Sequence, residues 1–167
     1  MNKIIFRTVI ISIATALALS QLAIAQQAFS NAEKATDEIE NIISRYQETP
    51  GAEGVNIGRF LIGAAKALVT DKEARMVMNY AKSIKVLEME KTGSDIKNKF
   101  KNAINGFKSR LSLGYKIMEV NDGDDNIIII GDEKKVSAIL VLSDGETVLV
   151  RVDMTPDQLS EIVTIAG

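Results

Sequence analysis

The spacing of apolar residues changes once along the chain, near residue 115. Before that point apolar residues recur every three or four positions, which is typical of amphipathic helices. This spacing predicts helices over residues 29–46, 59–69 and 96–111 and another that begins at residue 70, with short strands over 54–57 and 83–90. After residue 115 apolar and polar residues alternate. That period predicts four strands, over residues 115–120, 127–130, 136–142 and 147–154.

Capping signals mark the start of the first and last helices. Ser30 and Glu33 have the S-x-x-E spacing of a capping box, in which each residue bonds a free backbone amide of the first turn. Thr155 precedes Pro156, which is expected at the first helical position. A backbone N–H at that position has no acceptor within the helix, so proline is tolerated there. Gln158 completes a second box. These signals predict a helix start after Ser30 and another after Thr155.

The last two predicted strands are joined by turn chemistry. Asp144 and Gly145 lie between two alternating apolar runs, and this dipeptide tolerates the positive φ angles of a tight hairpin turn. Within the strand over 147–154, Arg151 and Asp153 face away from the apolar positions. We interpret these two residues as a surface ion pair.

Helices dominate the first half of the chain and a meander of strands the second, which predicts an α+β fold. We expect the helices to pack on one face of a mainly antiparallel sheet, with a C-terminal β-meander and a final helix. The other face is then wet, or covered by the first helix or by a partner. Residues 139–142 are apolar on both sides, which predicts a central strand. The Ala-rich and Leu-rich segment 59–69 is expected to be a buried helix.

The amino terminus has the pattern of a secretory signal peptide. Lys3 and Arg7 lie in an acid-free start, an uncharged and mostly apolar run follows, and Ala23 and Ala25 place small residues where signal peptidase reads them. Cleavage is predicted between Ala25 and Gln26, and a Gln at that point excludes lipid attachment. We therefore expect a signal peptide over residues 1–25, a single α+β domain over 26–167, and a periplasmic or secreted protein.

An uncleaved anchor is the alternative interpretation of the same segment. Residues 8–25 are uncharged and nearly long enough to span a bilayer. The small residues at the expected cut favour cleavage instead. The sequence does not specify which envelope membrane lies closer to the protein.

Composition narrows the chemistry that the domain can perform. The chain has no Cys and no His, which removes thiolate nucleophiles, the commonest general base and the commonest metal ligands. Its formal charge of −2 does not attract the negatively charged backbone of nucleic acid, so no nucleic-acid partner is expected. Its acids lie in turns, caps and exposed helix faces. We therefore predict no catalytic residue, no cofactor and no metal, and expect that the protein is not an enzyme.

The predicted helix over 96–111 carries the most distinctive charge pattern. Its polar face has no acid after Asp95. The basic residues that we propose as a docking surface are Lys97, Lys101, Lys108 and Arg110. Such a face fits an acidic partner or an anionic membrane surface, although a solvated helix face is the commoner meaning of such a pattern.

The loop from Asn121 to Asn126 is rich in oxygen ligands and is the one candidate for calcium. Extracellular calcium sites of modest affinity use loops of this kind. The loop lacks the spacing of an EF-hand, however, and its downstream Glu is absent. Turn chemistry alone explains Asn, Asp and Gly between two strands.

Three segments resemble the family catalogued as domain of unknown function 4252, small exported proteins of the Bacteroidota. They are residues 54–57, the "Y-x-x-M-E-V-x-D-G"-like segment that begins at Tyr115, and the hairpin over 139–150. Residues 59–61 depart from the Ser-Lys-Met-like run of many members. The resemblance implies an exported α+β domain with no assigned activity and no site residues to carry over. Members are often encoded near extracytoplasmic sigma factors, which fits a role in envelope responses.

The leading hypothesis is an exported, non-catalytic binding or regulatory module of the bacterial envelope, whose partner is another envelope protein. Two other hypotheses stay open. A carboxylate-based hydrolase needs two acids that face each other across a pocket. A structural protein would self-associate through the exposed sheet face or an edge strand. The ligand and the oligomeric state are not specified by the sequence.

Overall fold

The computed structural model describes residues 29, 31–66, 69–70 and 72–166. The predicted signal peptide over residues 1–25, its cleavage site and Ser30 lie outside these described residues. The helices are α2 (Ala32–Gln47), α3 (Arg59–Lys66), α4 (Lys72–Tyr80), α5 (Ser94–Leu111) and α6 (Pro156–Ala166). The strands are β1 (Glu53–Gly58), β2 (Ala81–Glu88), β3 (Lys116–Asp122), β4 (Asp125–Gly131), β5 (Val136–Leu142) and β6 (Glu146–Met154).

All six strands form one antiparallel sheet in the order β1-β2-β6-β5-β4-β3. The last four strands are a meander in which each strand pairs with the next along the chain, as the alternating pattern predicts. The β1–β2 pair then joins the meander through β2 and β6, which pair from Ala81 opposite Val152 to Glu88 opposite Glu146 with one register shift between Ala81 and Ser83. Strand β5 lies between β4 and β6, which confirms the prediction of a central strand.

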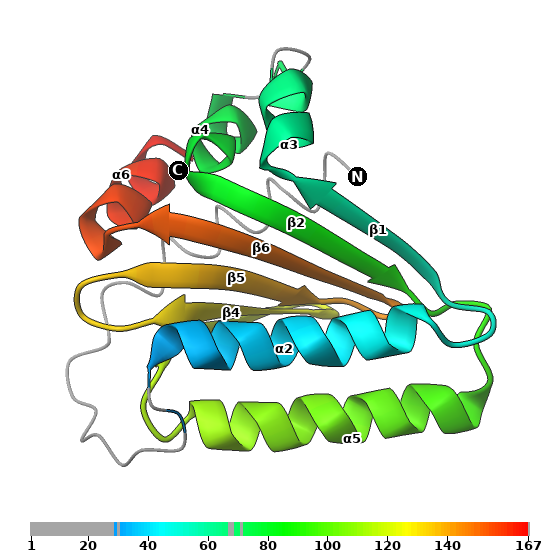
Figure 1. Cartoon of the computed structure of the whole chain (residues 1–167). Helices are drawn as coiled ribbons and strands as arrows, with labels where there is room; N and C mark the ends of the chain where they lie inside the picture. Colours follow the sequence, from blue (N-terminus) through cyan, green and yellow to red (C-terminus); the bar gives the residue numbers. More distant parts are fainter. Residues whose placement is uncertain (1–28, 30, 67–68, 71, 167) are drawn as a thin grey trace.

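The two long helices, α2 and α5, lie side by side on one face of the sheet (Figure 1). Helix α2 packs across β2, β6, β5 and β4. The core beneath them contains Ile39 and Ile43 of α2, Phe107 of α5 and Leu140 of β5, all fully buried. Edge-to-face contact of Tyr46 with Phe100, at 5.0 Å between ring centroids, joins the two helices.

A second core lies on the other face of the sheet. The short helices α3, α4 and α6 contribute Ile62, Val77 and Leu159 to it, and the strands contribute a larger apolar set. Figure 1 shows these helices gathered at one end of the sheet, away from α5. The predicted α+β class, antiparallel sheet, C-terminal meander and final helix are all confirmed. The expected packing of the helices on one face holds for α2 and α5, whereas α3, α4 and α6 pack on the other face.

Side chains of β6 alternate between the two cores as the sequence predicts. Val148, Val150, Val152 and Met154 belong to the second core, whereas Leu149 belongs to the core under α2 and α5. Arg151 and Asp153 follow the parity of Leu149. Arg151 therefore faces α2, whereas Asp153, beyond the end of that contact, is 54% exposed.

The two predicted helix starts have different outcomes. The box before α6 is confirmed, because Gln158 N donates to Thr155 Oγ1 at 3.2 Å and Thr155 N donates to Gln158 Oε1 at 2.8 Å. The predicted cap of α2, Ser30, is wrong by one residue: the cap is Asn31, whose Oδ1 accepts from Lys34 N at 2.8 Å. Asn and Ser cap equally well, so adjacent candidates cannot be ranked from sequence.

The segment over 59–69 is helical as far as Lys66, but it is not buried. Ile62 is the one buried residue of α3, while Phe60 is 88% exposed and Leu61 54% exposed. The prediction of a buried helix is therefore wrong. The apolar composition of this segment suggested burial, but α3 packs only one side against β1 and β2.

Candidate functional site

A pocket with a volume of about 570 Å³ opens between α5 and the turns that end two hairpins of the sheet. Its floor is apolar and comes from Met89, Phe100, Ile104 and Leu142. The polar residues around it are Lys97, Lys101, Asn105, Lys108, Asp124, Asn126, Ser143, Asp144, Gly145, Glu146 and Thr147. One wall is thus a helix with lysines, and the other is built from turns with acids.

The β5–β6 turn that forms part of the rim is held by backbone hydrogen bonds. Gly145 has φ of 80°, which an L side chain rarely adopts, so this position needs glycine. Ser143 N donates to Glu146 O at 2.9 Å and closes the turn. Met89 N donates to Gly145 O at 2.7 Å and ties the turn to the end of β2. The predicted Asp-Gly hairpin is confirmed, and it gives the pocket a fixed rim.

Lys97 and Lys101 are one helical turn apart on the pocket side of α5, and both are exposed. The Nζ of Lys97 donates to the backbone oxygen of Glu90 at 3.0 Å, an uncharged acceptor. Among the described residues, no carboxylate pairs with either lysine. The pocket therefore presents two cations whose charge is not compensated within the described part of the chain.

Lys108 also lines the pocket, but its charge is taken up by Glu119 of β3. Lys108 Nζ lies 2.7 Å from Glu119 Oε1, and Lys116 Nζ lies 2.8 Å from Oε2 of the same carboxylate. Asn126 Nδ2 donates to Glu119 at 3.0 Å. Burial raises the pKa of Glu119, but the hydrogen bonds from Lys108, Lys116 and Asn126 outweigh it and lower the pKa to about 2.

Arg110 does not line the pocket. Its guanidinium forms a two-pronged ion pair with the carboxylate of Glu38 on α2, in which Nη1 lies 2.9 Å from Oε2 and Nη2 contacts Oε1. The same guanidinium lies over the ring of Phe29, 5.4 Å from its centroid. The structure therefore brings Lys97, Lys101 and Lys108 together and places Arg110 in a contact between α2 and α5.

The acids of the pocket lie on the turns opposite α5. Asp124 belongs to the β3–β4 turn, Asp144 belongs to the β5–β6 turn, and Glu146 begins β6. In the predicted calcium candidate from Asn121 to Asn126, only Gly123 and Asp124 form the β3–β4 turn, because the other four residues are paired in β3 and β4. In the part of the chain with described side chains, no group of three or more acidic, His or Cys residues could hold a metal ion.

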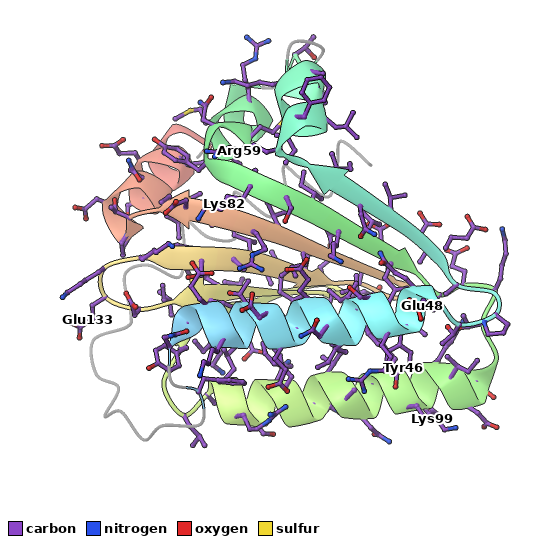
Figure 2. All side chains as sticks on the ribbon, viewed as in Figure 1. Tyr46, Glu48, Arg59, Lys82, Lys99 and Glu133 are labelled. Atoms are coloured by element: carbon purple, nitrogen blue, oxygen red, sulfur yellow. The ribbon has the colours of Figure 1, made fainter. Side chains whose placement is uncertain are left out.

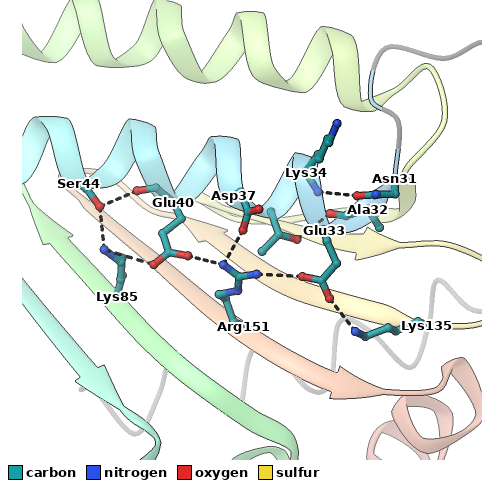
Figure 3. Close-up of polar contacts among 11 residues, drawn as sticks. Asn31, Ala32, Glu33, Lys34, Asp37, Glu40, Ser44, Lys85, Lys135 and Arg151 are labelled. Carbon is teal, nitrogen blue, oxygen red and sulfur yellow. Dashed lines mark hydrogen bonds and ion pairs between the residues drawn. The ribbon is translucent and has the colours of Figure 1, made fainter.

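A second polar site, which the sequence patterns described above do not predict, joins α2 to the sheet (Figure 3). Arg151 of β6 lies between three acids of α2. Its Nη2 is 2.9 Å from Glu33 Oε2, and its Nη1 is 2.7 Å from Asp37 Oδ1 and 2.6 Å from Glu40 Oε2. The three acids are spaced by four and three residues, so they follow one side of the helix. The predicted surface pair of Arg151 with Asp153 is therefore wrong.

The contacts of Arg151 continue into a connected network across the sheet. Lys85 Nζ lies 3.4 Å from Glu40 Oε1 and donates to Ser44 Oγ at 2.7 Å. At the other end, Lys135 lies 2.6 Å from Glu33, whose pKa is lowered chiefly by this hydrogen bond. Lys135 and Lys82 both pair with Asp153, at 3.6 and 2.9 Å. This network fixes α2 on the sheet. None of its residues lines the pocket.

A helical spacing of acids on α2 beside its apolar stripe was the signal that could have indicated this network. Glu33, Asp37 and Glu40 border the buried positions Ala35 and Ile39. Acids that border the buried side of a helix are expected to pair with cations of the strand or helix against which it packs. The sequence does not say that the cation is Arg151, which comes more than a hundred positions later.

The profile of the family described as Domain of unknown function (DUF4252) matches residues 46–162. The chain belongs to the DUF4252 family. The DUF4252 match includes all six strands and every residue that lines the pocket. Glu33, Asp37 and Glu40 precede the matched segment, whereas Arg151 lies inside it.

Other comparisons add no activity to the DUF4252 assignment. The search of curated proteins finds no match, and neither does the search of solved structures. Among the helices of the described residues, none has the length and hydrophobicity that a bilayer span requires.

Proposed function

We propose that this DUF4252 protein is an exported, non-catalytic binding or regulatory module of the bacterial envelope, and that the pocket beside α5 is its binding site. The observation that carries this proposal is the pair Lys97 and Lys101, two exposed and uncompensated cations over an apolar floor. The partner is a segment of another envelope protein that places an acidic side chain against these lysines.

The size of the pocket supports a short segment as the occupant. Its volume of about 570 Å³ lies within the range of sites that enclose small ligands or a few side chains. Phe100 and Ile104 give the floor an apolar surface that favours burial of an apolar group beside the acid. Such a pocket selects a segment with an apolar anchor next to an acidic residue.

The distribution of charge supports one orientation of that segment. Lysines lie on the α5 wall, and Asp124, Asp144 and Glu146 lie on the turn wall. A segment with an acid on one side and a base on the other complements both walls. Opposed charges of this kind set orientation and the rate of association more than affinity.

Charge reversal of Lys97 and Lys101 tests the proposal. The full chain is produced in its native host, crosslinked in cells, and the attached proteins are identified by mass spectrometry. We expect the Lys97→Glu, Lys101→Glu double variant to lose the crosslinked partner that the unchanged protein captures. Lys108 and Arg110 are kept, because reversing them would break their ion pairs with Glu119 and Glu38.

The matched control reverses two lysines that do not line the pocket. Lys34 on α2 and Lys99 on α5 are exposed, and Figure 2 shows Lys99 on the side of α5 away from the sheet. A Lys34→Glu, Lys99→Glu variant changes the net charge equally and should keep the partner. Capture that survives reversal of Lys97 and Lys101, or is lost equally in the control, would contradict the proposal.

The carboxylate-based hydrolase is the second candidate function, and one observation favours it. Three acids, Asp124, Asp144 and Glu146, line the same pocket. A glycosidase needs two such groups with different proton affinities on opposite sides of its substrate. Hydrolysis of a sugar or ester panel that is abolished by Asp144→Asn or Glu146→Gln would support it. Equal rates in the variants and the unchanged chain would eliminate it.

A further inference from the structure

The tip formed by β1 and α3 exposes apolar side chains that the rest of the molecule does not cover. Phe60 is 88% exposed, Leu61 54% and Val55 53%, whereas the other large apolar residue that is this exposed, among the described ones, is Leu113 at 46%. Gly63 and Ala64 are exposed on the same helix. Phe60 and Leu61 are adjacent on α3 and Val55 lies on the edge strand β1 that leads into it, and together they expose apolar surface that water solvates poorly.

The charges on α3 are both positive, whereas the one acid of β1, Glu53, lies at the far end of that strand and pairs with Lys91. Arg59 begins α3 and Lys66 ends it, and the helix contains no acid. Lys66 donates to the amide oxygen of Asn79, and Arg75 donates to the backbone oxygen of Val69 at 2.6 Å. These acceptors are uncharged, and Arg59 has no carboxylate partner among the described residues. The positive charges of the tip are therefore uncompensated in the described structure.

We propose that the tip formed by Val55, Phe60 and Leu61 docks onto an anionic phospholipid surface. Phe60 and Leu61 enter the boundary between headgroups and acyl chains, and Arg59, Lys66 and Arg75 contact the lipid phosphates. Exposed aromatic and aliphatic residues flanked by Arg and Lys are the features of helices that bind in the membrane interface. This surface is separate from the pocket and goes beyond the proposed function.

The size of the patch favours lipid over a second copy of the chain. A stable protein interface buries about 800 Å² on each partner and is built around a broad apolar centre. Three side chains at the end of an eight-residue helix supply much less than that. Facing copies of the tip would also bring Arg59 and Lys66 of one copy against those of the other. An anionic lipid surface instead complements both the exposed apolar side chains and the positive charges of the tip.

The position of the tip is compatible with docking on a membrane while the pocket stays open. Figure 1 shows α3 at one end of the molecule and α5 at the opposite end. Figure 2 places Arg59 at the base of α3 and Lys99 on α5, with the whole sheet between them. A molecule that touches lipid through α3 therefore directs α5 and its pocket away from the bilayer.

Vesicle co-sedimentation of the full chain tests the proposal. The vesicles contain equal parts of phosphatidylglycerol and phosphatidylethanolamine, and phosphatidylcholine vesicles are measured beside them. We expect binding to the anionic vesicles that weakens as salt is added. Phe60→Ser should lower the partition coefficient about tenfold, because it removes one buried aromatic side chain. Arg59→Gln and Lys66→Gln should each lower it about fivefold on anionic vesicles alone.

Matched variants keep the result interpretable. Leu113→Ser removes an exposed apolar side chain after α5, and Lys34→Gln with Lys99→Gln removes two positive charges elsewhere; both should leave binding unchanged. All variants carry the same amino terminus, so any contribution of residues 1–25 cancels. Phe60→Ser should unfold at the same temperature as the unchanged chain, since Phe60 is 88% exposed. Leu61→Ser is the second variant if Phe60→Ser fails to fold.

Three results would overturn the proposal. One is an unchanged chain that does not bind phosphatidylglycerol vesicles. Another is equal binding by the unchanged chain, Phe60→Ser and Leu61→Ser. The third is a dimer in sedimentation analysis that Phe60→Ser converts to monomer without any vesicle binding, which would identify a second copy as the occupant.

Discussion

The two faces of the sheet are stabilised in different ways. On the face that carries α2 and α5, apolar packing is joined by a network in which Lys85, Arg151 and Lys135 contact acids of α2. On the face that carries α3, α4 and α6, the core contains apolar side chains from the helices and strands. Among the described residues, the partners of the cations Lys66 and Arg75 near that face are uncharged acceptors.

This difference shows that a charged residue is available for a partner only if the fold leaves its charge uncompensated. Lys108 and Arg110 look like surface cations in the sequence, yet Glu119 and Glu38 neutralise them. Lys97 and Lys101 on the same helix, and Arg59 on α3, have no carboxylate partner among the described residues. Uncompensated cations are therefore the first positions to examine for binding.

The largest expected effect comes from removing the central cation of the network. Arg151→Ala leaves Asp37 without its cation among the described residues, and leaves Glu33 and Glu40 with Lys135 and Lys85 alone. We expect the free energy of unfolding to fall by about 3 kcal/mol, because Arg151 is only 23% exposed and three acids lose an ion pair at once. Urea unfolding measures this. Lys99→Ala is the control and should change stability by less than about 0.5 kcal/mol.

Removal of an apolar anchor on the other face should cost less. Ile62→Ala shortens the one buried side chain of α3, which is 2% exposed. We expect a loss of about 2 kcal/mol, toward the low end for such truncations because α3 lies at the end of the sheet and can relax. A larger loss than that of Arg151→Ala in urea unfolding would reverse the ranking of the two faces.

Acid sharpens the comparison, because the carboxylates that the structure describes in contacts between helices and the sheet lie on the α2 and α5 face. Glu119 has a pKa lowered from 4.5 to about 2, so its stabilising contribution is complete above about pH 5 and is lost as the pH falls through 2. Glu119→Gln should cost about 1.5 kcal/mol near neutral pH. The gap between variant and unchanged chain should close on acidification. A gap that stays constant from neutral pH to pH 2 would show that Glu119 acts by packing alone.

The smallest expected effect concerns a buried hydroxyl in β5. Ser137 is 2% exposed, and its Oγ has no hydrogen-bond partner among the described residues. Ser137→Ala removes an unsatisfied polar group without creating a large cavity. We expect the midpoint of thermal unfolding to stay the same or to rise. The corresponding gain in the free energy of unfolding is at most about 1 kcal/mol. A loss would mean that the hydroxyl has a partner that stabilises the fold.

The elements that the sequence predicts well are those specified by neighbouring residues. Asp144 and Gly145 specify a turn by their own backbone preferences, and Thr155 and Gln158 bond each other across one helical turn. The alternation that ends at Met154 specifies which side chains of β6 share a face. Each of these features needs only a few consecutive residues, so each is visible without the fold.

The features that the sequence does not predict depend on residues far apart. The partners of Arg151 lie on α2, at the other end of the chain, and no local pattern selects them. The exposure of Phe60 depends on where α3 meets the edge of the sheet. The pocket was indicated only in part: the lysines of α5 were identified, but the turns that complete it were interpreted as connections alone.

The pairing of β2 with β6 has a consequence for the order of folding. Strands β3 to β6 pair with their neighbours in the chain, so the meander can form early from local contacts. Strand β2 can pair with β1 at once, but its other neighbour, β6, comes after the rest of the meander, and α2 needs both β2 and β6 for its charged contacts. The contact of α2 with the sheet therefore forms only after distant parts of the chain have come together.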